Sequence, residues 1–73
     1  MRLISQNKDM DIPYELSALT CEQYDNDYAV AARFDAIRYI MGRYDSKDGA
    51  KLVLEAIRAA SMCNSKIFVF PER

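Results

Sequence analysis

A chain of 73 residues is long enough for one small hydrophobic core, so residues 1–73 are expected to form a single domain. Its composition, 51% hydrophobic and 29% charged with only two glycines and two prolines, is typical of a folded globular chain and excludes a disordered tail. The formal net charge of −1 supplies no general attraction to nucleic acid or acidic membranes, so any anion site must be local.

No apolar run approaches the roughly 18 residues that a membrane span needs, and the opening MRLISQNKD lacks the apolar segment of a signal peptide. We therefore expect a cytoplasmic protein with no membrane partner. Cys21 and Cys63 are too few for a disulfide scaffold and are expected to be reduced, structural thiols. Because the chain has no histidine, it lacks the commonest general base and an imidazole zinc ligand, and we expect no metal, no cofactor and no enzymatic activity.

The chain opens with a predicted hairpin. RLIS and MDIPYE are extended segments, and QNKD between them has the composition of a turn. Pro13 lacks an N–H group, which restricts the second strand to a sheet edge or ends it there. Alternation through SALTCEQY, residues 17–24, predicts a third strand, and the DND that follows predicts another turn.

Residues 28–34 and 37–44 are rich in aromatic and β-branched side chains, and only Asp35 and Ala36 separate them, which predicts a tight hairpin. Asp-Ala is an unfavourable pair for a primed turn. If Phe34 and Ile37 flank this turn, the face that meets the helix carries the pairs Ala32/Tyr39, Val30/Met41 and Tyr28/Arg43. The reverse face then carries the pairs Arg33/Arg38, Ala31/Ile40 and Ala29/Gly42.

From Asp45 onward the apolar spacing becomes helical, with Ala50, Val53, Leu54, Ile57 and Ala60 on one stripe. We expect a helix from about residue 46 to residue 61, with Asp45 or Ser46 as its N-cap and Asn64 in a left-handed C-terminal cap. KIFVF, ended by Pro71, is the predicted last strand. The predicted fold is α+β in the order βββββαβ, a mainly antiparallel sheet with one amphipathic helix on one face.

Both ends of the chain resemble a known family. The opening MRLISQ…DIPYE and the closing RYDSKDGAKLVLEAIRAAS…FVFPER are similar to the start and end of small proteins common in phages, prophages and mobile elements of Firmicutes. This chain departs from the family at DSKDG, where Asp48 and Gly49 replace paired glutamates. The family supplies no catalytic residue to transfer, so the resemblance implies only a source and a fold.

Arg33 and Arg38 are the first candidate site, because like charges placed directly opposite each other are mildly destabilising unless something compensates them. Three interpretations stay open. The guanidinium groups are solvated or paired with carboxylates such as Glu22, Asp27 or Asp35; they form a planar fork for a phosphate or carboxylate; or, with Ile40, they contact another protein.

KIFVF is the second candidate site. It places Ile67 and Val69 on one face and Phe68 and Phe70 on the other, and a single helix covers only one of them. The second apolar face predicts a homodimer or a higher oligomer, since self-association buries it. The five tyrosines are expected to pack between strands rather than to stack on bases, so nucleic acid is not an expected partner.

The function expected is that of a non-enzymatic interaction protein, with Arg33, Arg38, Ile40, Phe68 and Phe70 as binding residues. The source that the resemblance implies supplies the context: in a phage or mobile element we expect such a protein to bind a host protein, such as a defence component, and to block or adapt it. The alternative is a homo-oligomeric binder, or sponge, of a small anionic ligand such as a nucleotide, held by Arg33 and Arg38 from neighbouring copies.

Overall fold

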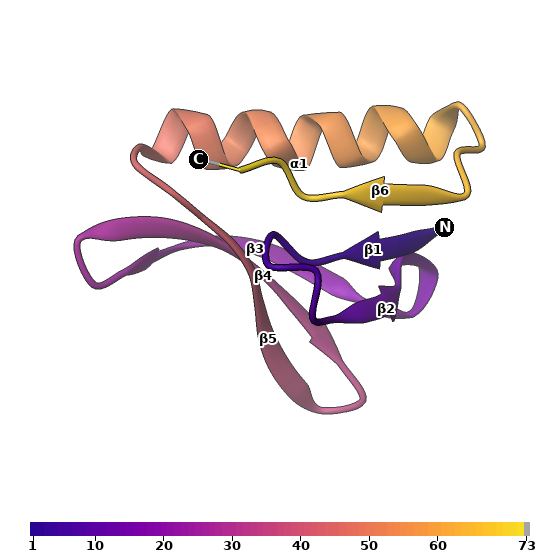
Figure 1. Ribbon diagram of the computed structural model, residues 1–73, viewed down its shortest axis with the longest axis horizontal. Coiled ribbons are helices and arrows are strands. Elements are labelled where there is room, and N and C mark those ends of the chain that lie inside the picture. The colour runs from indigo at the N-terminus through magenta and orange to yellow at the C-terminus, as the bar shows by residue number, and fades with distance from the viewer. Residues whose placement is uncertain (73) are drawn as a thin grey trace.

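The turn residues of the sequence separate the strands as expected. In the computed structural model, which describes residues 1–72, the strands are β1 (Arg2–Ile4), β2 (Asp11–Pro13), β3 (Ala18–Tyr24), β4 (Asp27–Phe34), β5 (Ile37–Tyr44) and β6 (Ile67–Val69). One turn of 3₁₀ helix, η1 (Tyr14–Leu16), joins β2 to β3, and the helix α1 (Lys47–Met62) joins β5 to β6 (Figure 1). This order confirms the predicted α+β class and the predicted succession of elements.

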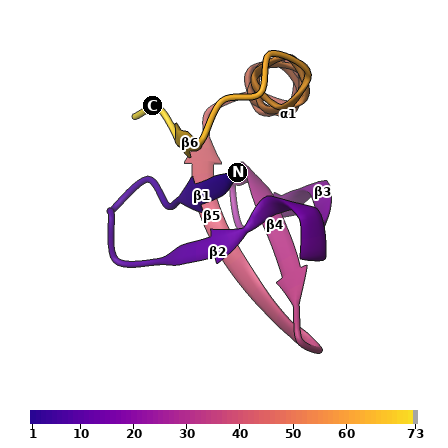
Figure 2. The same ribbon diagram turned by 90° about the vertical axis from the view of Figure 1, so that its right-hand side faces the viewer.

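The strands form two small sheets rather than one. One sheet has the order β2-β1-β6, and the other is the antiparallel meander β3-β4-β5. Strand β1 is antiparallel to β2 and parallel to β6, because α1 carries the chain back before β6 begins. Pro13 ends β2, which is an edge strand as predicted. Seen end-on, α1 lies above both sheets, over β6 on one side and β3 on the other (Figure 2).

Caps at both ends hold α1. The Ser46 side chain accepts a hydrogen bond from the Gly49 N–H at 3.0 Å, so Ser46 is the N-cap of the two candidates. At the other end Asn64 has a φ of 59°, which confirms the predicted left-handed cap. Ala50, Val53 and Ile57 form the buried stripe. Within residues 1–72, no helix combines the length and apolarity that crossing a bilayer requires.

The core lies between the two sheets and the helix. Its fully or almost fully buried side chains come from β1, β2, β4, β5, α1 and the residue directly after β6, namely Leu3, Ile12, Val30, Ala32, Met41, Tyr44, Ala50, Val53, Ile57 and Phe70. Leu19 and Cys21 of β3 are half-buried and pack against this cluster. Each fully buried leucine, isoleucine, valine, methionine or phenylalanine of the cluster contributes on the order of 1.5–3 kcal/mol by leaving water.

The hairpin between β4 and β5 turns through two residues in left-handed backbone conformations, Asp35 with φ 56° and Ala36 with φ 65°. Positive φ at both central positions is the pattern of a type I′ turn, whose twist matches that of the flanking strands. The register next to the turn is the predicted one, with Arg33 opposite Arg38 and Ala31 opposite Ile40.

Beyond Ala31 the predicted register is wrong, because β5 has a bulge. Val30 lies opposite Gly42 and Ala29 opposite Arg43, so Met41 is the extra residue. The bulge moves every later residue of β5 to the other face. Tyr44, 6% exposed, therefore enters the core, and Arg43, predicted on the helix side, reaches the reverse face.

Candidate functional site

The face of the β3-β4-β5 sheet turned away from the core carries most of the predicted site. Strand registers place Thr20 and Ile40 on either side of Ala31, and Glu22 and Arg43 on either side of Ala29. Both alanines are fully buried because these larger neighbours flank them. We call this surface the arginine face; its side chains are Thr20, Glu22, Ala29, Ala31, Arg33, Arg38, Ile40 and Arg43.

The two predicted arginines have different surroundings although they lie directly opposite each other. Arg38 of β5 reaches across β4 and forms an ion pair with Glu22 of β3. The Thr20 hydroxyl donates a hydrogen bond to Glu22 Oε2 at 3.0 Å. Arg33 is exposed, and no ion pair within residues 1–72 includes it. The two arginines therefore do not form a symmetric anion-binding fork, since Glu22 already neutralises Arg38 while Arg33 has no carboxylate partner in the described chain.

Arg43 is a third arginine of this face, although the register predicted from the sequence placed it on the other side of the sheet. Its Nη2 lies 3.0 Å from a carboxylate oxygen of Asp27 and 4.0 Å from one of Asp25, and its guanidinium lies 4.9 Å from the centroid of the Tyr24 ring. The Nε atom is buried without a hydrogen-bond partner among the described residues. These contacts fix Arg43 at the end of the sheet opposite Arg33.

Gln6 explains why β5 can bulge beside Arg43. The Gln6 N–H donates to the Met41 carbonyl at 2.7 Å, and its side-chain Oε1 accepts from the Arg43 N–H at 3.0 Å. Its Nε2 donates to the carbonyls of Arg43 and Pro71, at 3.2 and 3.1 Å. Gln6, in the loop after β1, thus supplies hydrogen-bond partners for the main-chain groups of Met41 and Arg43 that the bulge turns away from β4.

The aromatic residues predicted to bind a partner face the wrong way for that role. Phe70 is 1% exposed, and half-buried Phe68 lies against it with ring centroids 5.6 Å apart and nearly perpendicular planes. Their alternate neighbours Ile67 and Val69 are instead 59% and 46% exposed. The alternation in KIFVF is as predicted, but its exposed apolar face is that of Ile67 and Val69, because the core takes the larger aromatic rings.

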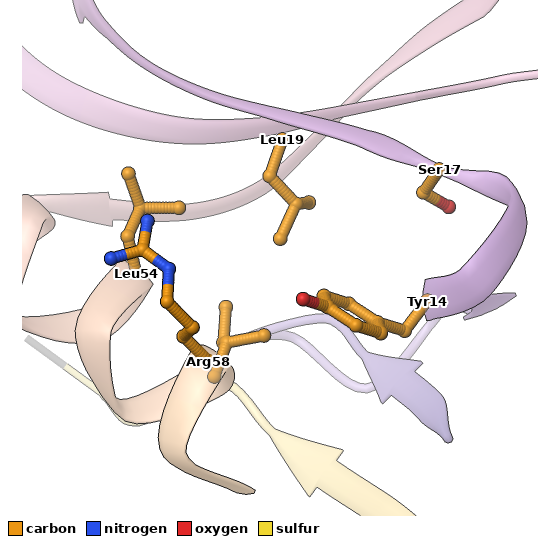
Figure 3. Close-up of a pocket in the computed structure, with 6 residues that line it drawn as sticks. Tyr14, Ser17, Leu19, Leu54 and Arg58 are labelled. Atoms are coloured by element: carbon orange, nitrogen blue, oxygen red, sulfur yellow. The ribbon is translucent and has the colours of Figure 1, made fainter. Parts of the chain in front are cut away.

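One pocket lies between η1, β3 and α1. Tyr14, Ser17, Leu19, Leu54 and Arg58 line it together with Ile57, and Figure 3 shows the Tyr14 hydroxyl and the Leu19 side chain directed into it. Its volume is about 160 Å³. Ligand sites usually have volumes of about 300–1,000 Å³, so this pocket is too small for a metabolite or nucleotide.

Two further pockets lie elsewhere on the surface. One of about 380 Å³ includes Glu15 and Lys66, and the hydrogen bond from the Met1 ammonium lowers the pKa of the Glu15 carboxyl. The other, of about 200 Å³, lies beside Gln6, Ile40 and Arg43. Neither Arg33 nor Arg38 lines any of these three pockets, so both predicted arginines lie on a surface away from them.

The cysteines and acidic residues form no evident chemical centre in the described part of the chain. Cys21 is half-buried, Cys63 is exposed, and both are free thiols. Residues 1–72 contain no group of three or more potential metal-ligating side chains. Comparison of the chain with models of protein families, with curated proteins and with solved structures finds no match.

Proposed function

We propose that this protein is a non-enzymatic interaction protein that binds an acidic surface of another protein through its arginine face. The observation that carries the proposal is Arg33, an exposed cation without an ion pair in the described chain, beside an arginine that has one. An arginine in this position can form bidentate bonds with a partner carboxylate without breaking an existing pair.

The composition of the arginine face also supports a protein partner. Half-buried Ile40 lies between the two ends of the face, beside Ala31 and two residues from Arg38. Arginine combined with apolar side chains is enriched in protein interfaces, whereas small molecules usually need a concave site. The resemblance to proteins of phages and mobile elements favours a cytoplasmic host protein, such as a defence component that this protein inhibits.

The alternative, a sponge for a small anionic ligand, rests on the same arginines. A phosphate held by both would have to displace Glu22 from Arg38, which costs part of the binding free energy. We therefore rank it second. Its distinguishing observation is a nucleotide retained by the purified protein, seen as excess absorbance at 260 nm.

The experiment is capture of partners from host extract, followed by mass spectrometry of proteins and small molecules and by measurement of the affinity of the captured partner. Arg33→Gln should weaken binding at least about tenfold, which is about 1.4 kcal/mol, and leave stability unchanged. The double variant that also contains Arg38→Gln should bind no better and lose up to about 1 kcal/mol of stability with the Glu22 pair.

A double variant of α1, Lys47→Gln with Lys51→Gln, is the matched control. It removes two positive charges from exposed side chains of the helix and should bind like the parent. Equal affinity of the Arg33→Gln variant and the parent would contradict the proposal. If a nucleotide were the only species captured, the protein-binding proposal would be wrong and the sponge for a small anionic ligand would take its place.

A further inference from the structure

Strand β6 is an edge strand whose outer main-chain groups no other strand of residues 1–72 uses. The Lys66 carbonyl accepts a hydrogen bond from the Arg2 N–H at 2.8 Å, and the Phe70 N–H donates to the Ile4 carbonyl at 2.9 Å. Main-chain groups alternate in direction along a strand, so those of Ile67 and Val69 point away from β1. Such an edge is a ready template for another strand.

Apolar side chains border this edge on both sides of the sheet. Exposed Ile67 and Val69 project from the outer side. On the inner side α1 runs alongside β6, above it in Figure 1 and displaced from it toward β3 in Figure 2. Leu54 lines the pocket next to β3 and so marks the flank of α1 that is turned toward β3. Leu52 and Ala56 lie on the opposite flank of the helix and therefore on the side of β6. The Leu52 side chain is 64% exposed.

A charge marks one end of the edge. Lys66 directly precedes β6, is exposed, and takes part in no ion pair within the described chain. A strand added to this edge would place one of its side chains opposite Lys66. Charge complementarity therefore favours a carboxylate there.

We propose that the free edge of β6 binds an extended segment of a partner protein as an added antiparallel strand. Two residues of that segment exchange main-chain hydrogen bonds with Ile67 and Val69, and their apolar side chains lie beside these two on the outer side. The residue between them, opposite Phe68, is apolar because its side chain is on the inner side of the sheet, where α1 lies. The next residue toward the C-terminus, opposite Lys66, is acidic.

A second copy of the chain does not suit this edge. A two-fold axis between two antiparallel β6 strands would bring the second α1 to the same side of this edge, where the first α1 already runs alongside β6 (Figures 1 and 2). In the register centred on Phe68, Lys66 would also face an apolar residue instead of a carboxylate. The inference rests on the proposed protein-binding function but concerns a different surface from the arginine face.

The test uses the isotope-labelled protein, NMR, and the capped peptide Thr-Val-Ile-Val-Asp-Thr, whose central four residues have the required pattern. At saturating peptide the amides of Ile67 and Val69 should shift and exchange with solvent at least about tenfold more slowly. A peptide with lysine in place of the aspartate should bind about two- to fivefold more weakly, as expected for an exposed ion pair. Lys66→Glu should reverse that preference, whereas Lys51→Glu, the same charge change on the exposed side of α1, should not.

The main-chain contribution is tested separately. Val69→Pro removes only an N–H that faces the free edge, so it should keep the β1–β6 pairing and lose at least about tenfold in affinity, while Val69→Thr keeps binding. If Val69→Pro does not fold, a peptide N-methylated at both valines makes the same test and should not bind.

Four results would overturn the inference. They are unchanged β6 amides at millimolar peptide, equal binding by the N-methylated peptide, the same effect from Lys51→Glu as from Lys66→Glu, and protection of the β6 amides by protein concentration alone. Arg33→Gln should bind the peptide like the parent. A negative result for peptide binding at β6 would therefore not contradict the proposed role of the arginine face, which the capture experiment tests separately.

Discussion

Replacing Ala36 by glycine should stabilise the protein. Ala36 occupies the second central position of the type I′ turn with a φ of 65°, where its Cβ crowds the backbone. A left-handed conformation costs a residue with a side chain about 1–2 kcal/mol. Glycine avoids this cost but gives up about 0.4–1 kcal/mol, because it makes the unfolded chain more flexible. The expected net gain from Ala36→Gly is about 0.5–1 kcal/mol.

Urea denaturation followed by circular dichroism measures this gain. With a slope of about 1 kcal/mol per molar urea for so small a domain, the midpoint should rise by about 0.5–1 M with the slope unchanged. The melting temperature should rise by about 2–8 °C.

Ala56→Gly is the control, since Ala56 is exposed in the middle of α1 and the same change there should cost about 1 kcal/mol. The two substitutions thus have opposite expected signs. A lower midpoint for Ala36→Gly would refute the reasoning about the turn.

Three further predictions follow from packing, burial and exposed apolar surface. Ile57→Ala, at a fully buried position of α1, should cost about 2–5 kcal/mol and lower the urea midpoint steeply, whereas Lys51→Ala should change stability by at most about 0.5 kcal/mol; equal effects would contradict the helix phase. Burial raises the pKa of Tyr44 from 10.0 to about 12. The protonated hydroxyl therefore contributes fully to the free energy of unfolding below pH 10, and this contribution is lost as the pH rises toward 12. In denaturation curves, Tyr44→Phe should abolish the fall in stability between pH 10 and 12. The exposed side chains of Ile67 and Val69 predict that two sheets associate face to face at micromolar concentration, a contact that does not pair the β6 edges. Light scattering that gives a monomer of 8.4 kDa at high concentration would exclude it.

Local signals in the sequence predict most of the fold. Ser46 and Asn64 mark the two ends of α1 because their side chain and backbone preferences act within one helical turn. Pro13 predicts an edge strand from its missing N–H alone. The effects of these cap residues and of Pro13 depend on near neighbours in the chain and not on the tertiary packing around them.

The features that the sequence did not predict depend on contacts between distant segments. The bulge at Met41 requires Gln6, whose side chain reaches residues 37 positions away, and alternation along β5 contains no trace of it. Arg43 was therefore placed on the wrong face. In KIFVF both faces are apolar, so alternation alone could not show that Phe70 is the buried one.

The long interval between the two strands of the parallel pair affects the folding kinetics of this small protein. Leu3 pairs with Phe68, and Gln6 binds the Pro71 carbonyl 65 positions further along the chain. At a synthesis rate of about 5–20 residues per second, β1 waits roughly 3–13 s for β6 to be made. During that time β2 can pair with one edge of β1, but the edge that β6 will occupy is open to foreign strands, while the β3-β4-β5 meander can already form from local contacts. The nascent chain should therefore be most prone to aggregation just before its last strand is synthesised.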